Sequence, residues 1–227
     1  MEKIKMTYLI EFRFSGYPYT YLKKLRYDLN NRFRFTGYHR KRYVPHITIV
    51  PPITLHLFKR RYIKRIQKTI LSYAERIHER GELIKTGKPI FFDTPEGAKV
   101  LALEIKPTQT LQYLADELQT TINKGWFSKC ITYPENLWHA TIAISRNPRY
   151  HSRLREAYYH LKQRPPQRMK FIMDRITILN NGRIVKEIDL VDKQVLRRIE
   201  ALDRSKRRSQ YLKIKEELKA KGEKFEY

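Results

Sequence analysis

The chain has little cysteine, little glycine and no long apolar run, and these shortages exclude several classes of protein. Cys130 has no partner within the chain, so a disulfide-stabilised scaffold is excluded. No stretch approaches the roughly 20 apolar residues that a membrane helix needs, and the N-terminus carries no apolar segment of signal-peptide length. The 227 residues are nevertheless 41% hydrophobic, which is enough to bury a core. We therefore expect a soluble, cytoplasmic protein with no membrane partner.

Carboxylates are also scarce, because 23 Asp and Glu stand against 48 Lys and Arg, for a formal net charge of +25. From Leu29 to Ala74 there are eleven Lys and Arg and no carboxylate at all, and from Asn136 to Met173 eight cations stand against Glu156 alone. A generally charged, thermophile-type surface would mix the two signs. Windows of one sign favour a partner that carries phosphates, such as a nucleic acid.

The hydrophobic periodicity alternates between the strand and helix periods and predicts a mixed α+β chain. Pro51 and Pro52 are expected to end the second strand, because proline cannot donate to a ladder. Asn180-Asn181-Gly182 predicts a tight hairpin. The ranges expected as strands are 6–14, 44–50, 89–92, 99–105, 138–144, 171–179 and 184–190. The ranges expected as helices are 19–33, 62–77, 110–122 and 151–161.

Two halves of the chain resemble each other at one fixed offset. The pentapeptide that begins at Leu9 (LIEFR) matches the one that begins at Ala102 (ALEIK), which is 93 residues later. Leu25 and Leu118, on the helices that follow, are also 93 residues apart, and so are two histidines described next. Three matches in the same order indicate a duplicated unit of strand, helix and strand.

The best-matched repeat element is a pair of four-residue motifs, His46-Ile-Thr48-Ile and His139-Ala-Thr141-Ile. On a strand, alternate side chains point to opposite faces. Each motif is therefore expected to present its imidazole and its hydroxyl on one face and its apolar residues to the core. A pseudo-twofold arrangement of the halves would bring all four polar groups together across a cleft.

Two histidines and two threonines in one cleft suit acid–base chemistry on a phosphodiester. One neutral imidazole takes a proton from the attacking oxygen while the other, protonated, gives one to the leaving oxygen. The threonine hydroxyls can donate hydrogen bonds to the charged phosphate oxygens. This chemistry requires no cofactor, and no metal site is expected, because the chain has no His-Glu-x-x-His motif and no cysteine pair.

Over residues 6–190 the duplicated chain with paired motifs resembles the two-histidine (2H) phosphoesterase superfamily, including the 2′-5′ RNA ligase-like proteins that act as RNA 2′,3′-cyclic phosphodiesterases. The resemblance implies two lobes whose antiparallel sheets line a central cleft, with helices outside. It maps the catalytic histidines to His46 and His139 and the phosphate-binding hydroxyls to Thr48 and Thr141. It also implies that an RNA or nucleotide with a terminal cyclic phosphate is opened to a 2′-phosphate. We assign the acid role to His46 and the base role to His139.

Residues that flank the motifs are candidates for binding the substrate. Aromatic side chains can stack on bases, and basic side chains can contact phosphates. The aromatic candidates are Tyr43, Tyr133 and Trp138, and the basic candidates are Arg40, Arg42 and Arg146.

The pattern changes near Asp192, so we expect a phosphoesterase domain over residues 1–191 and a basic helical extension over residues 192–227. No Pro or Gly interrupts this extension before Gly222, and its first half is expected to pack on the body, with a basic arm toward RNA as the alternative. Alternative functions are a 2′-5′ RNA ligase or 2′-5′ phosphodiesterase with the same site, a non-catalytic RNA-binding module, and an enzyme for a small nucleotide. The sequence does not predict the oligomeric state.

Overall fold

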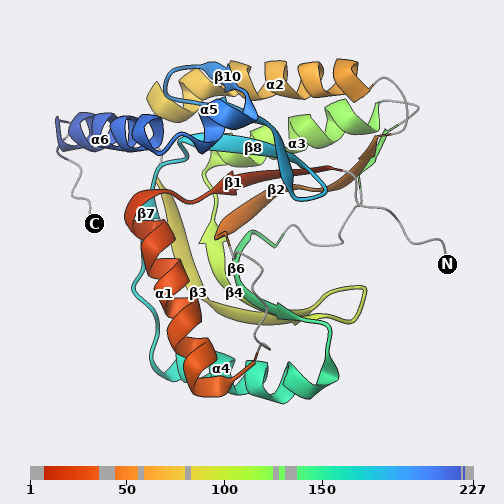
Figure 1. The fold of residues 1–227 in the computed structure, drawn as a ribbon, viewed down its shortest axis with the longest axis vertical. Helices are drawn as coiled ribbons and strands as arrows, with labels where there is room; N and C mark the ends of the chain where they lie inside the picture. The colour runs from red at the N-terminus through yellow and green to blue at the C-terminus, as the bar shows by residue number, and fades with distance from the viewer. Residues whose placement is uncertain are drawn as a thin grey trace.

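The computed structural model describes residues 8–35, 44–55, 59–79, 83–124, 128–130, 137–220 and 222. These residues form an α+β fold, as predicted, in which helices cover a large antiparallel sheet (Figure 1). Within the described ranges, no helix has both the length and the apolar character needed to span a membrane.

One sheet runs through the molecule in the order β10-β9-β8-β1-β2-β6-β4-β3-β7, and β5 pairs with β2 off this path. Every described pair of neighbouring strands is antiparallel. The strands are β1 (Tyr8–Arg13), β2 (His46–Leu55), β3 (Ile84–Asp93), β4 (Lys99–Lys106), β5 (Ser128–Cys130), β6 (His139–Ser145), β7 (Lys170–Phe171), β8 (Arg175–Asn180), β9 (Arg183–Asp189) and β10 (Gln194–Leu196).

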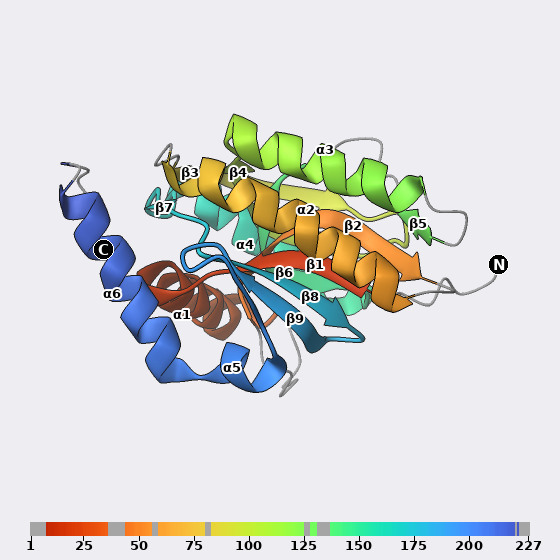
Figure 2. The same ribbon diagram turned by 90° about the horizontal axis from the view of Figure 1, so that it is seen from above.

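The helices divide into two layers, one for each half of the sheet. In Figures 1 and 2, α2 and α3 lie side by side over the half that contains β1, β2 and β8, while α1 and α4 lie against the half that contains β3, β4 and β6. The helices are α1 (Gly16–Phe33), α2 (Lys59–Glu79), α3 (Gln109–Asn123), the 3₁₀ helix η1 (Pro148–Tyr150), α4 (His151–Gln163), α5 (Arg198–Leu202) and α6 (Arg204–Ala220).

The duplication is visible in the boundaries of the elements. Helices α1 and α3 begin 93 residues apart, and so do strands β2 and β6. The two halves of the sheet meet where β2 pairs with β6 at Ile47 and Ala140, and these two residues are also 93 positions apart. When a residue pairs with its own repeat equivalent, the pseudo-twofold axis passes between the two residues. The axis therefore lies between the two motifs.

The core consists of the inner stripes of the helices and the inward residues of the strands. Helix α2 shows why the sequence folds this way, because Ile63, Ile66, Ile70, Ala74 and Ile77 recur at helical spacing and are all buried. The motif strands contribute their apolar positions to the same core.

The expectation that Pro51 and Pro52 end the second strand was wrong, because β2 continues to Leu55. The β1–β2 ladder shifts register in this region, where the pairs Ile10–Val50 and Tyr8–Ile53 leave two residues of β2 opposite one of β1. Such a bulge leaves a residue without a ladder bond, so proline is tolerated there.

The extension after residue 191 contacts the body through buried side chains. On α6, Gln210 and Ile214 are buried, and the ring of Tyr211 lies against Gly16 at the start of α1. The expectation of a helical extension was wrong in two places. Residues Gln194–Leu196 form strand β10 against β9, and Asp203 has an extended backbone between α5 and α6. The Asp203 carboxylate accepts hydrogen bonds from the Ser205 N–H (2.9 Å) and hydroxyl (2.6 Å) and so caps the start of α6.

Candidate active site

The two motifs lie on the two central strands, and their side chains alternate as strand geometry requires. His46, Thr48, His139 and Thr141 are half-buried, whereas the apolar motif residues are buried. In an antiparallel pair, the register at Ile47–Ala140 places His46 opposite Thr141 and Thr48 opposite His139. His46 and His139 are therefore diagonal neighbours across the two strands. Side chains at diagonal positions lie about 7–8 Å apart, so the two imidazoles flank a space of about the size of a phosphate group.

Both imidazoles are held by a backbone carbonyl two residues earlier. Nδ1 of His46 lies 2.9 Å from the Val44 oxygen, and Nδ1 of His139 lies 2.7 Å from the Leu137 oxygen. A carbonyl oxygen can only accept, so Nδ1 carries a hydrogen in each ring. The other nitrogen, Nε2, is therefore the one available for proton transfer in both histidines.

The surroundings of His139 favour its neutral form. Burial lowers the pKa of His139, because loss of water penalises the charged imidazolium, and the hydrogen bond to Leu137 opposes this shift. A positive charge on His46 lowers the pKa of His139 further. Phe92 contributes to the burial with its ring edge-on to the imidazole, at 5.0 Å between centroids.

An ion pair between Glu11 and Arg13 lies beside His46. The Glu11 carboxylate is buried, and its Oε2 lies 3.8 Å from Nε2 of His46. Its Oε1 accepts a hydrogen bond of 2.6 Å from Nε of Arg13, which is the register partner of His46 on β1.

The repeat equivalent of Glu11 is placed differently. Glu104 is the register partner of His139, yet its Oε2 accepts a 3.4 Å hydrogen bond from the Lys88 N–H. The carboxylate also occupies the space above Gly87, where a Cβ would collide with Oε2. The duplicated strands thus give their two histidines unlike electrostatic surroundings.

A cavity of about 630 Å³ opens on this face of the sheet. Among the described residues, its lining includes His139 and both motif threonines but not His46, whose side chain is 30% exposed. Trp138 and Pro52 belong to its mostly apolar wall. A cavity of this size accommodates a nucleotide-sized ligand with polar groups at one end.

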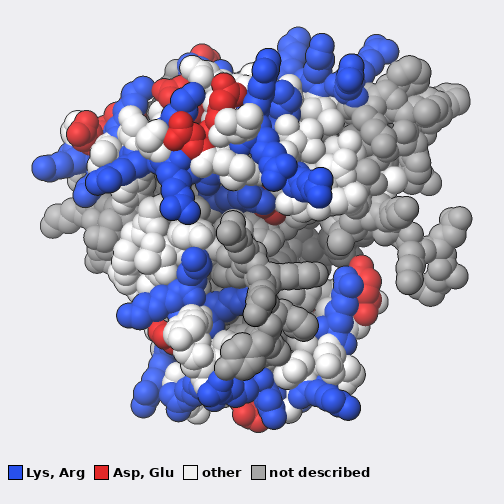
Figure 3. Space-filling view, in the orientation of Figure 1, with Lys and Arg blue, Asp and Glu red and all other residues white. Residues whose placement is uncertain are grey.

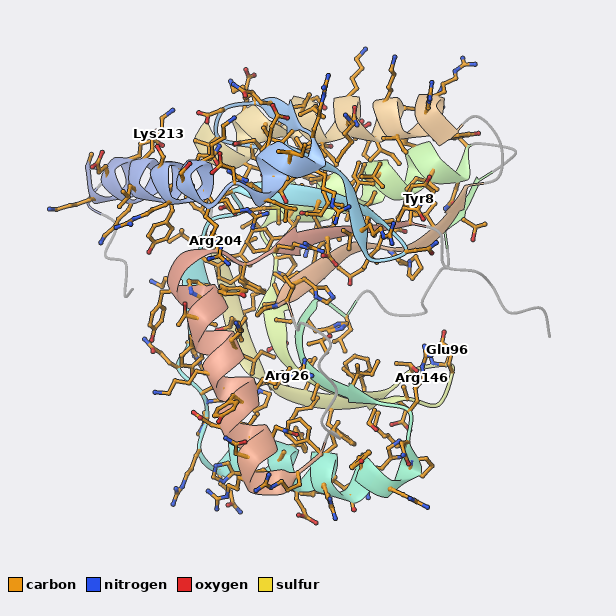
Figure 4. All side chains as sticks on the ribbon, viewed as in Figure 1. Tyr8, Arg26, Glu96, Arg146, Arg204 and Lys213 are labelled. Atoms are coloured by element: carbon orange, nitrogen blue, oxygen red, sulfur yellow. The ribbon has the colours of Figure 1, made fainter. Side chains whose placement is uncertain are left out.

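Of the other predicted binding residues, Arg146 is among the described residues, and it does not line this cavity. Arg146 is exposed at the far end of β6, near the β3–β4 turn that contains Glu96 (Figure 4), seven residues and about 23 Å along the strand from His139. Arg40, Arg42, Tyr43 and Tyr133 lie outside the described residues. In the part of the chain that the structure describes, no group of three His, Cys, Asp or Glu side chains is placed to hold a metal ion.

Glu11, Arg13 and Phe92 were not identified from the sequence as site residues. Glu11 and Arg13 stood in the repeated pentapeptide, where charged residues interrupt an apolar strand, and this was the available signal. No sequence signal identified Phe92 as a site residue, because an aromatic residue on a strand is usually a core residue.

Replacing Phe92 by alanine is expected to raise the pKa of His139 toward its ordinary value of about 6.5, because water then reaches the ring. A base that must be neutral becomes inactive as the pH falls through its pKa, so the acidic limb of kcat/KM should move to higher pH. A pH–rate profile measures this shift. Phe91→Ala is the matched control, since Phe91 stacks on Tyr158 instead, and an equal shift in both variants would contradict the assignment.

Comparison with known proteins gives a structural likeness only. No family model matches the sequence, and no curated protein matches it. Usb1 of Kluyveromyces marxianus, in its structure with uridine monophosphate, is similar with a TM-score of 0.45 and 8% identity over 82% of this chain and 98% of that chain. Another Usb1 structure from the same organism gives a TM-score of 0.44 with the same identity and coverage. The chemistry of the site is therefore derived from its own side chains.

Proposed function

We propose that the protein is a phosphoesterase of the 2H type that opens RNA 2′,3′-cyclic phosphates to 2′-phosphates. The observation that carries this proposal is the pairing of Ile47 with Ala140, its repeat equivalent, which sets two His–Thr pairs around one point on one face of the sheet. Two proton-transfer groups on opposite sides of one phosphate can serve the attacking and the leaving oxygen at the same time.

The lowered pKa of His139 supports this residue as the base, which leaves the acid role to His46. Nε2 of neutral His139 accepts a proton from water as the water oxygen bonds to phosphorus. The bond from phosphorus to the 3′ oxygen breaks, and Nε2–H of His46 donates its proton to that oxygen. The product carries a 2′-phosphate, and exchange of one proton with solvent restores both histidines.

The remaining polar groups support the phosphate rather than the proton transfers. Thr48 and Thr141 both line the cavity, and we assign to their hydroxyls hydrogen bonds to the non-bridging oxygens, where charge increases in the transition state. Arg13 adds a positive charge beside His46. The overall charge of +25 raises the local concentration of an anionic substrate.

The direct test is incubation of the protein, in EDTA, with an oligoribonucleotide that ends in a 2′,3′-cyclic phosphate. A 2′-phosphate product, identified by its resistance to a 3′-specific phosphatase, is the expected result. Lack of turnover with the RNA still bound would contradict the proposal and favour a binding module. Turnover only of a 2′-5′ linkage would move the assignment to a 2′-5′ phosphodiesterase or ligase that uses the same four groups.

A further inference from the structure

Helix α2 carries a one-signed cationic face on the side away from the sheet. Five exposed side chains over the first three turns are basic, and no carboxylate occurs on the helix before Glu75. At about 100° per residue the five fall in an arc of about 140°, opposite the buried isoleucine stripe. We call this the α2 face, and its members are Arg60, Arg61, Lys64, Arg65 and Lys68.

The α2 face has no described counter-ions. None of its five cations forms an ion pair with a carboxylate in the part of the chain that the structure describes. The acidic residues of this layer lie toward the other end of the helix, where Glu75 pairs with Lys193 at 2.6 Å and Glu117 lies close to Tyr73. Figure 3 shows this upper edge in blue over α2, whereas red and blue are mixed around α5 and α6.

Helices α4 and α6, which also face solvent, differ from α2 because they carry exposed carboxylates among their cations. Helix α4, which stands in the repeat position of α2, has Glu156 exposed among its cations, and α6 has Glu216 and Glu217. Five like charges within three turns repel one another, which opposes folding unless a polyanion is the usual partner. Charge complementarity therefore points to a chain of phosphates along α2.

Strand β2 connects this face to the candidate active site. The strand begins at His46 and ends at Leu55, and α2 begins at Lys59 (Figure 1). Nine steps along a strand cover about 30 Å. The α2 face and the motif side chains lie on opposite sides of the sheet, so the path between them is longer than this distance. A stacked nucleic acid strand carries one phosphate about every 3.4 Å, so a stacked chain that reaches both places must exceed about nine nucleotides.

We propose that the α2 face binds the sugar–phosphate backbone of an RNA strand whose 3′ end lies in the cleft. This inference rests on the proposed function for the nature of the polyanion, and it specifies the substrate as an RNA chain longer than the cleft alone can hold. The exposed side chains of α2 project away from the body in Figure 4. Contacts from these side chains to RNA phosphates carry no base specificity.

The test compares two triple variants with unmodified protein. Arg61→Gln/Lys64→Gln/Lys68→Gln removes three charges from the α2 face. The matched control, Arg155→Gln/Lys162→Gln/Arg164→Gln, removes three exposed cations from α4 and its C-cap. Binding of a uridine oligomer of about 20 nucleotides is measured against salt concentration, and turnover of a cyclic-phosphate trinucleotide is measured beside it. Thermal denaturation verifies that both variants fold.

The α2 variant should bind the long RNA at least tenfold more weakly at low salt, because its plot of log affinity against log salt is shallower by about 2 for three lost contacts. Its turnover of the trinucleotide should equal that of unmodified protein. An equal loss of RNA binding in the α4 variant would overturn the inference. Binding of the same variants to anionic vesicles is measured in parallel, and an α2 variant that loses vesicle binding but keeps RNA binding would also overturn it. If the α2-dependent binding is present and no RNA is turned over, the binding inference stands and the proposed function fails.

Discussion

Alanine at either His46 or His139 should slow the opening of a cyclic phosphate by about 10²–10⁴-fold, because each removes one proton transfer from the same step. The loss is expected in kcat, with little change in KM, since the threonines and basic groups that hold the phosphate remain. Steady-state kinetics on a cyclic-phosphate oligoribonucleotide measure it. Circular dichroism and thermal denaturation show whether the variants keep the fold, which is expected because both side chains are half-buried.

The two variants should differ in activity on a substrate whose leaving group needs no acid. The test substrate is a 2′-deoxyuridine 3′-phosphodiester with 4-nitrophenol as its leaving group. It has no 2′ hydroxyl to attack the phosphorus, so water remains the attacking group, and nitrophenolate departs without a proton. His46→Ala should regain most of its activity on this ester, whereas His139→Ala should remain slow because the attacking oxygen still needs a base. Recovery of His139→Ala instead would reverse the roles, and full activity of both variants on the cyclic phosphate would exclude paired-histidine catalysis.

The second large effect concerns stability at Asp174, where the start of α1, the strand β8 and the helix α6 meet. Burial raises the pKa of Asp174 from 3.8 to about 6, although the Ser15 hydroxyl donates a 2.9 Å hydrogen bond to Oδ2. Its Oδ1 is buried and has no described hydrogen-bond partner. A pKa raised in the folded state contributes stability below pH 3.8 that is lost as the pH rises through about 6.

Asp174→Asn should therefore gain stability relative to the unmodified protein as the pH rises from 4 to 7. The difference between the two unfolding free energies should grow by up to about 3 kcal/mol over this window. Urea denaturation at several pH values measures it. Asp203→Asn is the control, because hydrogen bonds from Ser205 hold the pKa of Asp203 below its usual value of 3.8, so its difference from the unmodified protein should change little between pH 4 and 7. A difference that stays constant with pH would show that Asp174 is charged in the folded state.

The elements nearest the site were the most predictable from the sequence. Both motif strands and the helices that begin at Gly16 and Gln109 follow from strong local periodicity, and the fixed offset of 93 residues predicted which elements correspond. The offset alone does not state that Ile47 pairs with Ala140. That pairing depends on how two sheets join, which is a long-range property that no local pattern contains.

Electrostatic roles within the site could not be predicted in the same way. The two motifs are nearly identical in sequence, yet Glu11 lies near His46 while its repeat equivalent Glu104 bonds to the backbone of Lys88. This difference arises from side-chain placement on neighbouring strands. The break between α5 and α6 was similarly hidden, because Asp203 reads as one more charge in a charged helix until its capping contacts are known.

The central claim is that His46 and His139 act together on one phosphate, and a double-mutant cycle tests it most directly. Values of kcat are measured on one cyclic-phosphate oligoribonucleotide for unmodified protein, His46→Ala, His139→Ala and the double variant. Groups that act as a unit in one step are strongly non-additive, so the double variant should be only slightly slower than the slower single variant. Losses that multiply would show two independent contributions, and that result would contradict a shared acid–base step.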